Sequence, residues 1–193
     1  DLSLVVSGVN EQIAVVGQAL ATEQATATKS DAPLLETPAS VSVVTSGEIE
    51  ARGATSVPQA LRYATAIVPE SRGAMTALDY MYSRGFLVNQ YQDGLRLLSG
   101  GYSIPQLDPA LLERVELLRG PASVLYGQAD PGGVLNLATK QATGASIREV
   151  TFQVGSYDRV QAGFDVGGRV GDTGSLAYRT AGTANAADTQ VDH

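Results

Sequence analysis

The strictest pattern in this sequence is an alternation of apolar and polar side chains that recurs three times in its last fifty or so residues. Apolar residues fill every second position of residues 150–154 and 160–166, and a third run, 176–182, places Arg179 opposite Leu176. Because successive side chains of a strand point to opposite faces, the pattern predicts three antiparallel strands. One apolar and one polar face fit either the edge of a soluble sandwich or membrane-barrel strands with lipid outside and polar groups inside.

Residues 36–143 combine strand-like runs with short helix signals. The run ASVSVVT is rich in β-branched residues and ends at Thr45, which forms a helix capping-box pattern with Glu48. A hydroxyl residue before Pro58 marks a second short helix, and Asp108 before a proline marks a third start. The runs VELL and VLNLATK indicate further strands. This region is therefore predicted to be a small mixed unit of strands and short helices.

Residues 1–35 differ from the rest of the chain. Two short β-prone runs, DLSLVVSGV and EQIAVVGQ, precede ALATEQATATKSDAP, a tract of small and polar residues with little to bury. The pattern predicts a flexible tether that carries a β-prone segment.

Charge and residue content disfavour several classes of function. The 20 acidic and 13 basic residues give a net charge of −7, which repels nucleic acid. The chain has no cysteine and its one histidine is His193, so thiolate metal sites and nucleophile–base pairs lack their residues. The glycine-rich GQADPGGV lacks the Lys and Ser or Thr of a phosphate loop. No run approaches the ~18 apolar residues of a membrane helix, so the chain is either soluble or meets a membrane as strands.

Four motifs, in this order and spacing, carry a family resemblance: TPASVSVVTSGEIEARGATSVPQALRY, SRGF, YQDGLRL and LDPALLERVELLRGPASVLYGQADPGGVLNLATK. They resemble the plug domain of TonB-dependent siderophore receptors of the ferrichrome and ferrioxamine type. The resemblance implies an α+β plug domain over residues 36–143, with a small mixed sheet and short helices. Residues 144–193 then resemble the first three antiparallel strands of a transmembrane β-barrel of about 22 strands, in the bacterial outer membrane with the N-terminus in the periplasm.

The resemblance also assigns roles to the N-terminal residues. The family's TonB box, which adds a strand to the partner protein TonB, is expected at residues 11–17. Its residues are Glu11, Gln12, Ile13, Ala14, Val15, Val16 and Gly17. Residues 18–35 would be a flexible linker. Residues 1–10 would be the end of a preceding signalling domain.

Two further sets of residues follow from the matched motifs. The residues expected to bind a ferric chelate lie on outward-facing loops and are Arg72, Asn89, Gln90, Tyr91, Gly101 and Tyr102. An arginine and phenols suit a compact chelate rich in oxygen atoms. The residues expected to hold the plug in the barrel are Arg84, Arg119, Glu113 and Glu116, and the arginines' carboxylate partners are expected beyond residue 193.

The implied function is import of a ferric siderophore, with hydroxamates favoured, by a receptor that TonB energises. No catalysis is expected and no cofactor, because iron arrives chelated; the other expected contact is outer-membrane lipid. Two alternatives stay open. The cargo could be cobalamin or another metal chelate, or the chain could belong to a surface receptor that senses a siderophore or serves phages and bacteriocins.

Overall fold

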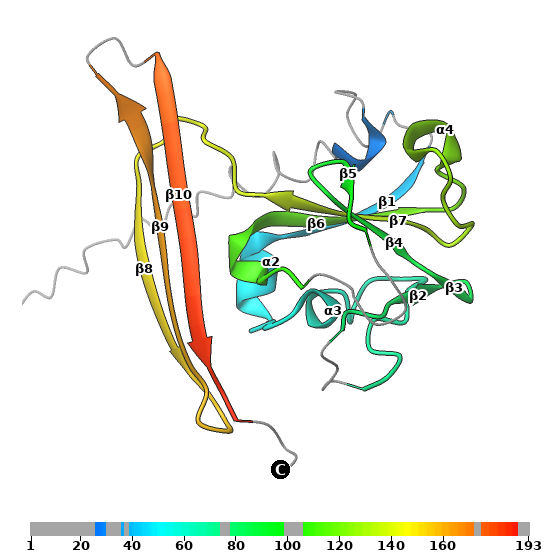
Figure 1. Ribbon diagram of the computed structural model, residues 1–193, viewed down its shortest axis with the longest axis horizontal. Helices are drawn as coiled ribbons and strands as arrows, with labels where there is room; N and C mark the ends of the chain where they lie inside the picture. The colour runs from blue at the N-terminus through cyan, green and yellow to red at the C-terminus, as the bar shows by residue number, and fades with distance from the viewer. Residues whose placement is uncertain are drawn as a thin grey trace, which may run out of the picture.

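The computed structural model describes residues 26–29, 36, 39–73, 78–98, 106–171 and 175–188, which form two larger sheets side by side and a small hairpin (Figure 1). The first sheet has the strand order β1-β6-β7-β4-β5. Its strands are β1 (Ser40–Thr45), β6 (Leu112–Arg119), β7 (Gly133–Thr139), β4 (Asn89–Gln92) and β5 (Leu95–Arg96). Strand β4 runs parallel to β7 and the other neighbours are antiparallel, which confirms the predicted mixed sheet.

Short helices flank this sheet, and three of them begin at caps that the sequence predicts. They are η1 (Thr26–Thr28), α2 (Ser46–Ala51), α3 (Val57–Ala60), η3 (Pro109–Leu111) and α4 (Ser123–Tyr126). Thr45 and Glu48 form the predicted capping box, in which each side chain accepts a hydrogen bond from the other's backbone N–H, at 3.0 and 3.3 Å. Asp108 caps η3 through Ala110 N at 2.9 Å. We call η1, β1 to β7 and the helices among them the mixed domain.

Strands β6 and β7 are buried on both faces, so the mixed domain has three layers. On one face Val115, Leu117 and their neighbours on β7 pack against Ile49 of α2 and Val57 of α3. On the other face Leu118 and Val134 pack with Ala27, Tyr91 and Ala122. Only Glu116 and Asn136, which lie opposite each other, interrupt the apolar residues at the centre of these two strands.

The segment after β2 (Tyr82–Ser83) and β3 (Phe86–Leu87) corrects one expectation. Residues 89–91 were expected in an outward loop, but they belong to strand β4, because they continue the sheet in parallel register with residues 134–136. Gln90 and Tyr91 are buried. The chain turns back only at Asp93 and Gly94, both with positive φ, as the DG pair favours.

The second sheet is an antiparallel set with the order β10-β9-β8, which stands beside the mixed domain and faces α2 (Figure 1). Its strands are β8 (Ile147–Val154), β9 (Val160–Val170) and β10 (Leu176–Ala186). Val150, Phe152 and Phe164 are exposed on one face, whereas Gln161 and Asp165 are buried on the face toward the mixed domain. The predicted alternation is confirmed. We call this sheet the wall sheet.

Gly182 shows how closely the wall strands approach. The ring of Phe164 lies over Gly182, its cross-strand neighbour, and a Cβ at that position would come within 2.7 Å of the ring. An apolar ring that covers a glycine on the neighbouring strand is a known way to support a glycine in a sheet. Among the described residues, no helix is long and apolar enough to cross a membrane.

Candidate functional site

The carboxylate of Glu116 lies at the centre of the mixed domain with no exposed surface. It accepts hydrogen bonds from the backbone N–H of Ala27 at 2.6 Å, from Asn136 Nδ2 at 3.0 Å and from Arg114 Nε at 2.6 Å. A buried charge is costly unless it is paired and hydrogen-bonded, and these three donors meet that need. One carboxylate therefore joins β6, β7 and η1.

Tyr126, at the end of α4, also contacts Ala27, at its backbone carbonyl. Its hydroxyl donates to the carbonyl oxygen of Ala27 at 2.8 Å. Lys29 lies 4.4 Å from the Tyr126 ring centroid and donates to Leu125 O at 2.9 Å. Burial, together with the nearby charge of Glu116, raises the pKa of Tyr126 to about 12, so its hydroxyl stays a neutral donor. Both backbone polar groups of Ala27 are thus held, and we call Glu116, Tyr126 and η1 the N-terminal clamp.

The clamp gives Glu116 a role inside the mixed domain, and its expected part in holding the plug in the barrel stays a prediction. Its hydrogen bonds to Ala27, Arg114 and Asn136 all lie within the mixed domain. Glu116 therefore holds the segment that follows the predicted TonB box. Residues 11–17 themselves lie outside the described residues.

Arg179 of β10 joins the wall sheet to the mixed domain. Its guanidinium donates to both oxygens of Asp165 on β9, at 3.0 and 2.8 Å, and to Glu113 Oε2 on β6 at 3.1 Å. Lys140, just after β7, pairs with the same Asp165 at 2.9 Å. We call these four residues the wall cluster. Glu113 of the mixed domain therefore contacts the wall sheet through Arg179, while its expected part in the network of Arg84 and Arg119 stays a prediction.

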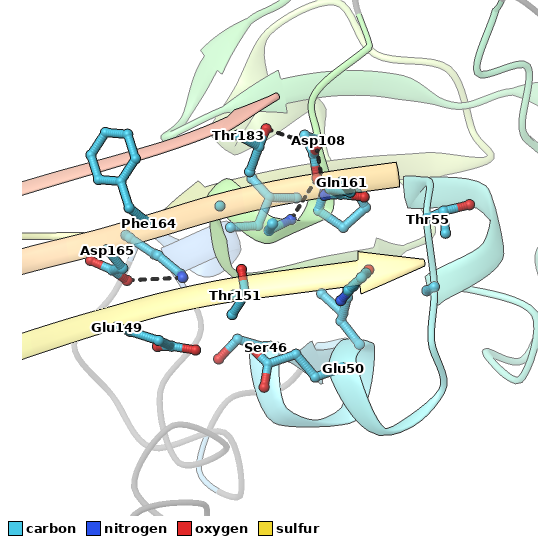
Figure 2. Close-up of a pocket in the computed structure, with 18 of the residues that line it drawn as sticks. Ser46, Glu50, Thr55, Asp108, Glu149, Thr151, Gln161, Phe164, Asp165 and Thr183 are labelled. Carbon is cyan, nitrogen blue, oxygen red and sulfur yellow. Dashed lines mark hydrogen bonds and ion pairs between the residues drawn. The ribbon is translucent and has the colours of Figure 1, made fainter. Parts of the chain in front are cut away.

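A cavity of about 200 Å³, lined by both polar and apolar residues, lies between the wall sheet and the α2 and η3 end of the mixed domain. Figure 2 shows side chains from both parts that line it, including Glu50, Asp108, Glu149 and Thr183. Asp108 lines this cavity and accepts hydrogen bonds from Thr183 Oγ1 at 2.9 Å and Gln161 Nε2 at 3.3 Å. The two parts therefore meet through polar contacts around open space, rather than through a continuous apolar core.

Arg84 and Arg119, the two arginines predicted to hold the plug in the barrel, lie in different surroundings. Arg119 donates to Ser40 Oγ at 2.8 Å, to Ser42 Oγ and to Thr65 O at 3.2 Å, and so holds β1 to β6. Arg84 is exposed at positive φ in the turn between β2 and β3. Pairing with carboxylates beyond residue 193 stays a prediction for both.

The predicted chelate-binding residues divide into three groups. Arg72 is exposed, and its guanidinium lies 4.3 Å from the ring centroid of Tyr80. Asn89 bonds Asp130 at 3.1 Å and Arg96 at 2.9 Å, while Gln90 and Tyr91 are buried with partners in the mixed domain. The remaining two, Gly101 and Tyr102, lie outside the described residues.

Sequence patterns alone missed the residues that complete these clusters: Ala27, Tyr126, Asn136, Lys140, Asp165 and Arg179. One signal was present, because a glutamate and an asparagine each interrupt a run of apolar residues on β6 and β7. Within the described ranges, no group of three or more His, Cys, Asp or Glu residues is placed to hold a metal ion.

Solved structures share this arrangement of a mixed domain joined to an antiparallel sheet. The pyoverdine outer membrane receptor from Pseudomonas aeruginosa PAO1, bound to pyoverdine, matches with a TM-score of 0.78 and 28% identity over 86% of this chain and 25% of that chain. The alcaligin outer membrane receptor from Bordetella pertussis matches with a TM-score of 0.72 and 28% identity, over 86% and 30% of the two chains. The fold is therefore that of a part of these outer-membrane receptors.

The sequence comparisons identify the family. Residues 33–134 match the model of the TonB-dependent receptor plug domain, so the chain belongs to that family. It is 39% identical to the ferrichrome outer membrane transporter/phage receptor of Escherichia coli K12, over 88% of this chain and 23% of that protein. It is also 39% identical to the ferrioxamine B receptor of Salmonella typhimurium SL1344, over 86% and 25%. The chain thus spans 23% and 25% of the length of these two relatives.

The N-terminal clamp predicts that Glu116→Ala exposes Ala27. In the cysteine-free chain, Ala27→Cys provides a single buried thiol. We expect a thiol reagent to label it about tenfold faster in Glu116→Ala, because a hydrogen bond to a buried charged group contributes about 1.5–3 kcal/mol. Glu113→Ala, on the same strand, is the control and should leave labelling slow. Equal labelling in all three backgrounds would contradict the clamp.

The wall cluster predicts an order of stabilities. Arg179→Met removes the cation that Asp165 and Glu113 share and should lower the free energy of unfolding by about 1.5–3 kcal/mol, because Lys140 still pairs with Asp165. Glu113→Gln should cost less, because Glu113 is partly exposed and Arg179 keeps Asp165. Arg62→Met, which removes an exposed pair with Glu70, should cost about 1 kcal/mol or less. Thermal unfolding of the purified protein tests this order, and a reversed order would refute it.

Proposed function

We propose that the chain is the plug and the first three barrel strands of an outer-membrane receptor that binds and imports a ferric siderophore, with hydroxamates favoured. The names of the two 39% identical relatives, a ferrichrome transporter and a ferrioxamine B receptor, support this cargo. Both matches extend across the mixed domain and into the wall sheet, since each covers more than four fifths of the chain. Localisation in the bacterial outer membrane follows from the same relatives, with the exposed apolar face of β8 to β10 against lipid.

We also propose that the plug gates the barrel lumen. The observation that supports this part of the proposal is the N-terminal clamp. A pull by TonB on residues 11–17 would travel along the chain and reach η1 before the sheet. Ala27 is bound there through both backbone groups to Glu116 and Tyr126, which belong to β6 and α4. The load on the N-terminus is therefore delivered to β6, an inner strand of the sheet.

We call the end of the plug that carries α3, the β2–β3 hairpin and Arg72 the ligand end, and it lies away from this clamp. Figure 1 shows α3 and the β2–β3 hairpin at the end of the mixed domain toward the turn between β8 and β9, whereas α4 lies at the opposite end. Arg72 belongs to the ligand end, where its guanidinium rests on Tyr80. A guanidinium offers several donors in a plane, which suits the oxygen-rich surface of a ferric hydroxamate. In this proposal iron is cargo and the receptor performs no catalysis.

Cobalamin is a second candidate cargo. The chain is 34% identical over 166 residues to the vitamin B12 transporter of Photobacterium profundum, a lower identity than to the ferrichrome and ferrioxamine relatives.

Titration of the full-length receptor tests the cargo. We expect ferrichrome or ferrioxamine to quench tyrosine fluorescence, with weaker effects from ferric pyoverdine and cobalamin. Arg72→Ala should weaken hydroxamate binding about tenfold, the effect of about 1.4 kcal/mol. Arg52→Ala is the matched control, since Arg52 also lies over a tyrosine, Tyr63, but it caps the C-terminal end of α2 and pairs with Glu48. Absence of quenching by both hydroxamates would reject the assignment.

Transport tests the TonB segment separately from binding. Val15→Pro removes a backbone donor that strand addition needs, so we expect loss of uptake with unchanged chelate affinity. Val15→Thr keeps that donor and should preserve uptake. Normal growth of the proline variant on the chelate as sole iron source would remove residues 11–17 from the mechanism.

A further inference from the structure

Asp79 is a buried acid at the ligand end of the plug, with only 3% of its surface exposed. Its carboxylate accepts a hydrogen bond from Gln106 Nε2 at 3.0 Å, and its backbone carbonyl accepts one from Gln90 Nε2 at 2.9 Å. Gln90 lies on β4 and Gln106 leads into η3. One residue therefore ties together three segments that are distant in the sequence.

The next residue, Tyr80, connects this junction to Arg72. The Tyr80 ring is buried beneath the Arg72 guanidinium, and Ser71 Oγ donates to the Tyr80 carbonyl at 3.1 Å. Because the peptide unit between Asp79 and Tyr80 is rigid, the position of Asp79 constrains where Tyr80 presents its ring. That ring in turn supports the guanidinium.

The burial of Asp79 carries an energetic cost. Desolvation raises the pKa of its carboxyl group, and the hydrogen bond from Gln106 opposes that rise. An apolar side chain at this position would avoid the cost but would leave the Gln106 amide without this acceptor. The same side chain borders a second, small cavity of about 90 Å³ that Gln59 and Glu70 also line.

We propose that Asp79 is a positioning residue for the ligand site, which fixes Tyr80, and through it Arg72, against β4 and Gln106. The inference rests on the proposed function and deepens it, because Asp79, Tyr80 and Gln106 do not belong to the predicted ligand contacts. Among the predicted ligand contacts, Arg72 is the one cation that the structure describes. Asp79 orients it through the hydrogen bond from Gln106 rather than through its own charge.

Affinity of the full-length receptor for ferrichrome and ferrioxamine, measured by tyrosine quenching, tests the proposal. Asp79→Leu should bind about tenfold more weakly, the order expected when one buried hydrogen bond is lost. Asp79→Asn should bind as the wild type does, because an amide oxygen can accept from Gln106. Gln106→Leu removes the same bond from the other side and should reproduce the loss.

A double variant tests whether the effect passes through Arg72. Arg72→Ala combined with Asp79→Leu should bind no more weakly than Arg72→Ala alone. Gln59→Leu is the matched control, since Gln59 lines the same small cavity but its side chain bonds only Thr55, and it should keep full affinity.

Three results would overturn the inference while the wild type still binds. They are wild-type affinity in both Asp79→Leu and Gln106→Leu, weak binding by Asp79→Asn equal to that of Asp79→Leu, and losses that add when Arg72→Ala is combined with Asp79→Leu. If both leucine variants have a lower melting temperature but unchanged affinity, this counts as the first of these results. A wild-type receptor that binds neither hydroxamate would instead overturn the proposed function, and the inference with it.

Discussion

A single buried carboxylate organises this plug. Glu116 sits in the middle of β6, opposite Asn136 of β7, and Ala27, Asn136 and Arg114 supply donors to its buried carboxylate. If η1 left, the carboxylate would lose one of these donors, and buried charges that lose partners are strongly destabilising. The hydrogen bond that holds the N-terminal segment is therefore also one of those that compensate the buried charge at the centre of the sheet.

The polar contacts of the plug divide by location. The N-terminal segment is held by Glu116 and Tyr126, the wall sheet by Glu113 and Lys140, and the ligand end by Asp79. The described hydrogen bonds and ion pairs to the wall sheet come from residues 108–141, the last part of the plug before the strands begin. Apolar burial holds the sheet together, while separate polar clusters attach each edge to something outside it. Polar attachments suit a domain that must change its contacts, because water can replace a hydrogen bond that opens.

Much of the fold was predictable from local chemistry. Capping at Thr45 and Asp108, the turn at Asp93 and the period-two strands each depend on residues within a few positions of one another. The error at residues 89–91 has a different origin. The matched motifs placed them on an outward-facing loop, but parallel pairing with β7 put them in a strand and buried Tyr91 against Tyr126. Nothing near Asn89 in the sequence reports that partner.

The sequence by itself determined the family, the alternation that gives the wall sheet one apolar and one polar face, and the positions of α2, α3 and η3, because each follows from neighbouring residues or from an ordered set of motifs. Only the tertiary structure decided which acid faces which partner. Glu113 and Glu116 stand three residues apart on one strand, yet one reaches Arg179 of the wall and the other holds Ala27. The reason is geometric: Glu113 lies where the β6–β7 register shifts, between Leu112 and Arg114, so it departs from the regular alternation that directs Glu116 toward η1. What covers each position is set by chain segments far away in the sequence.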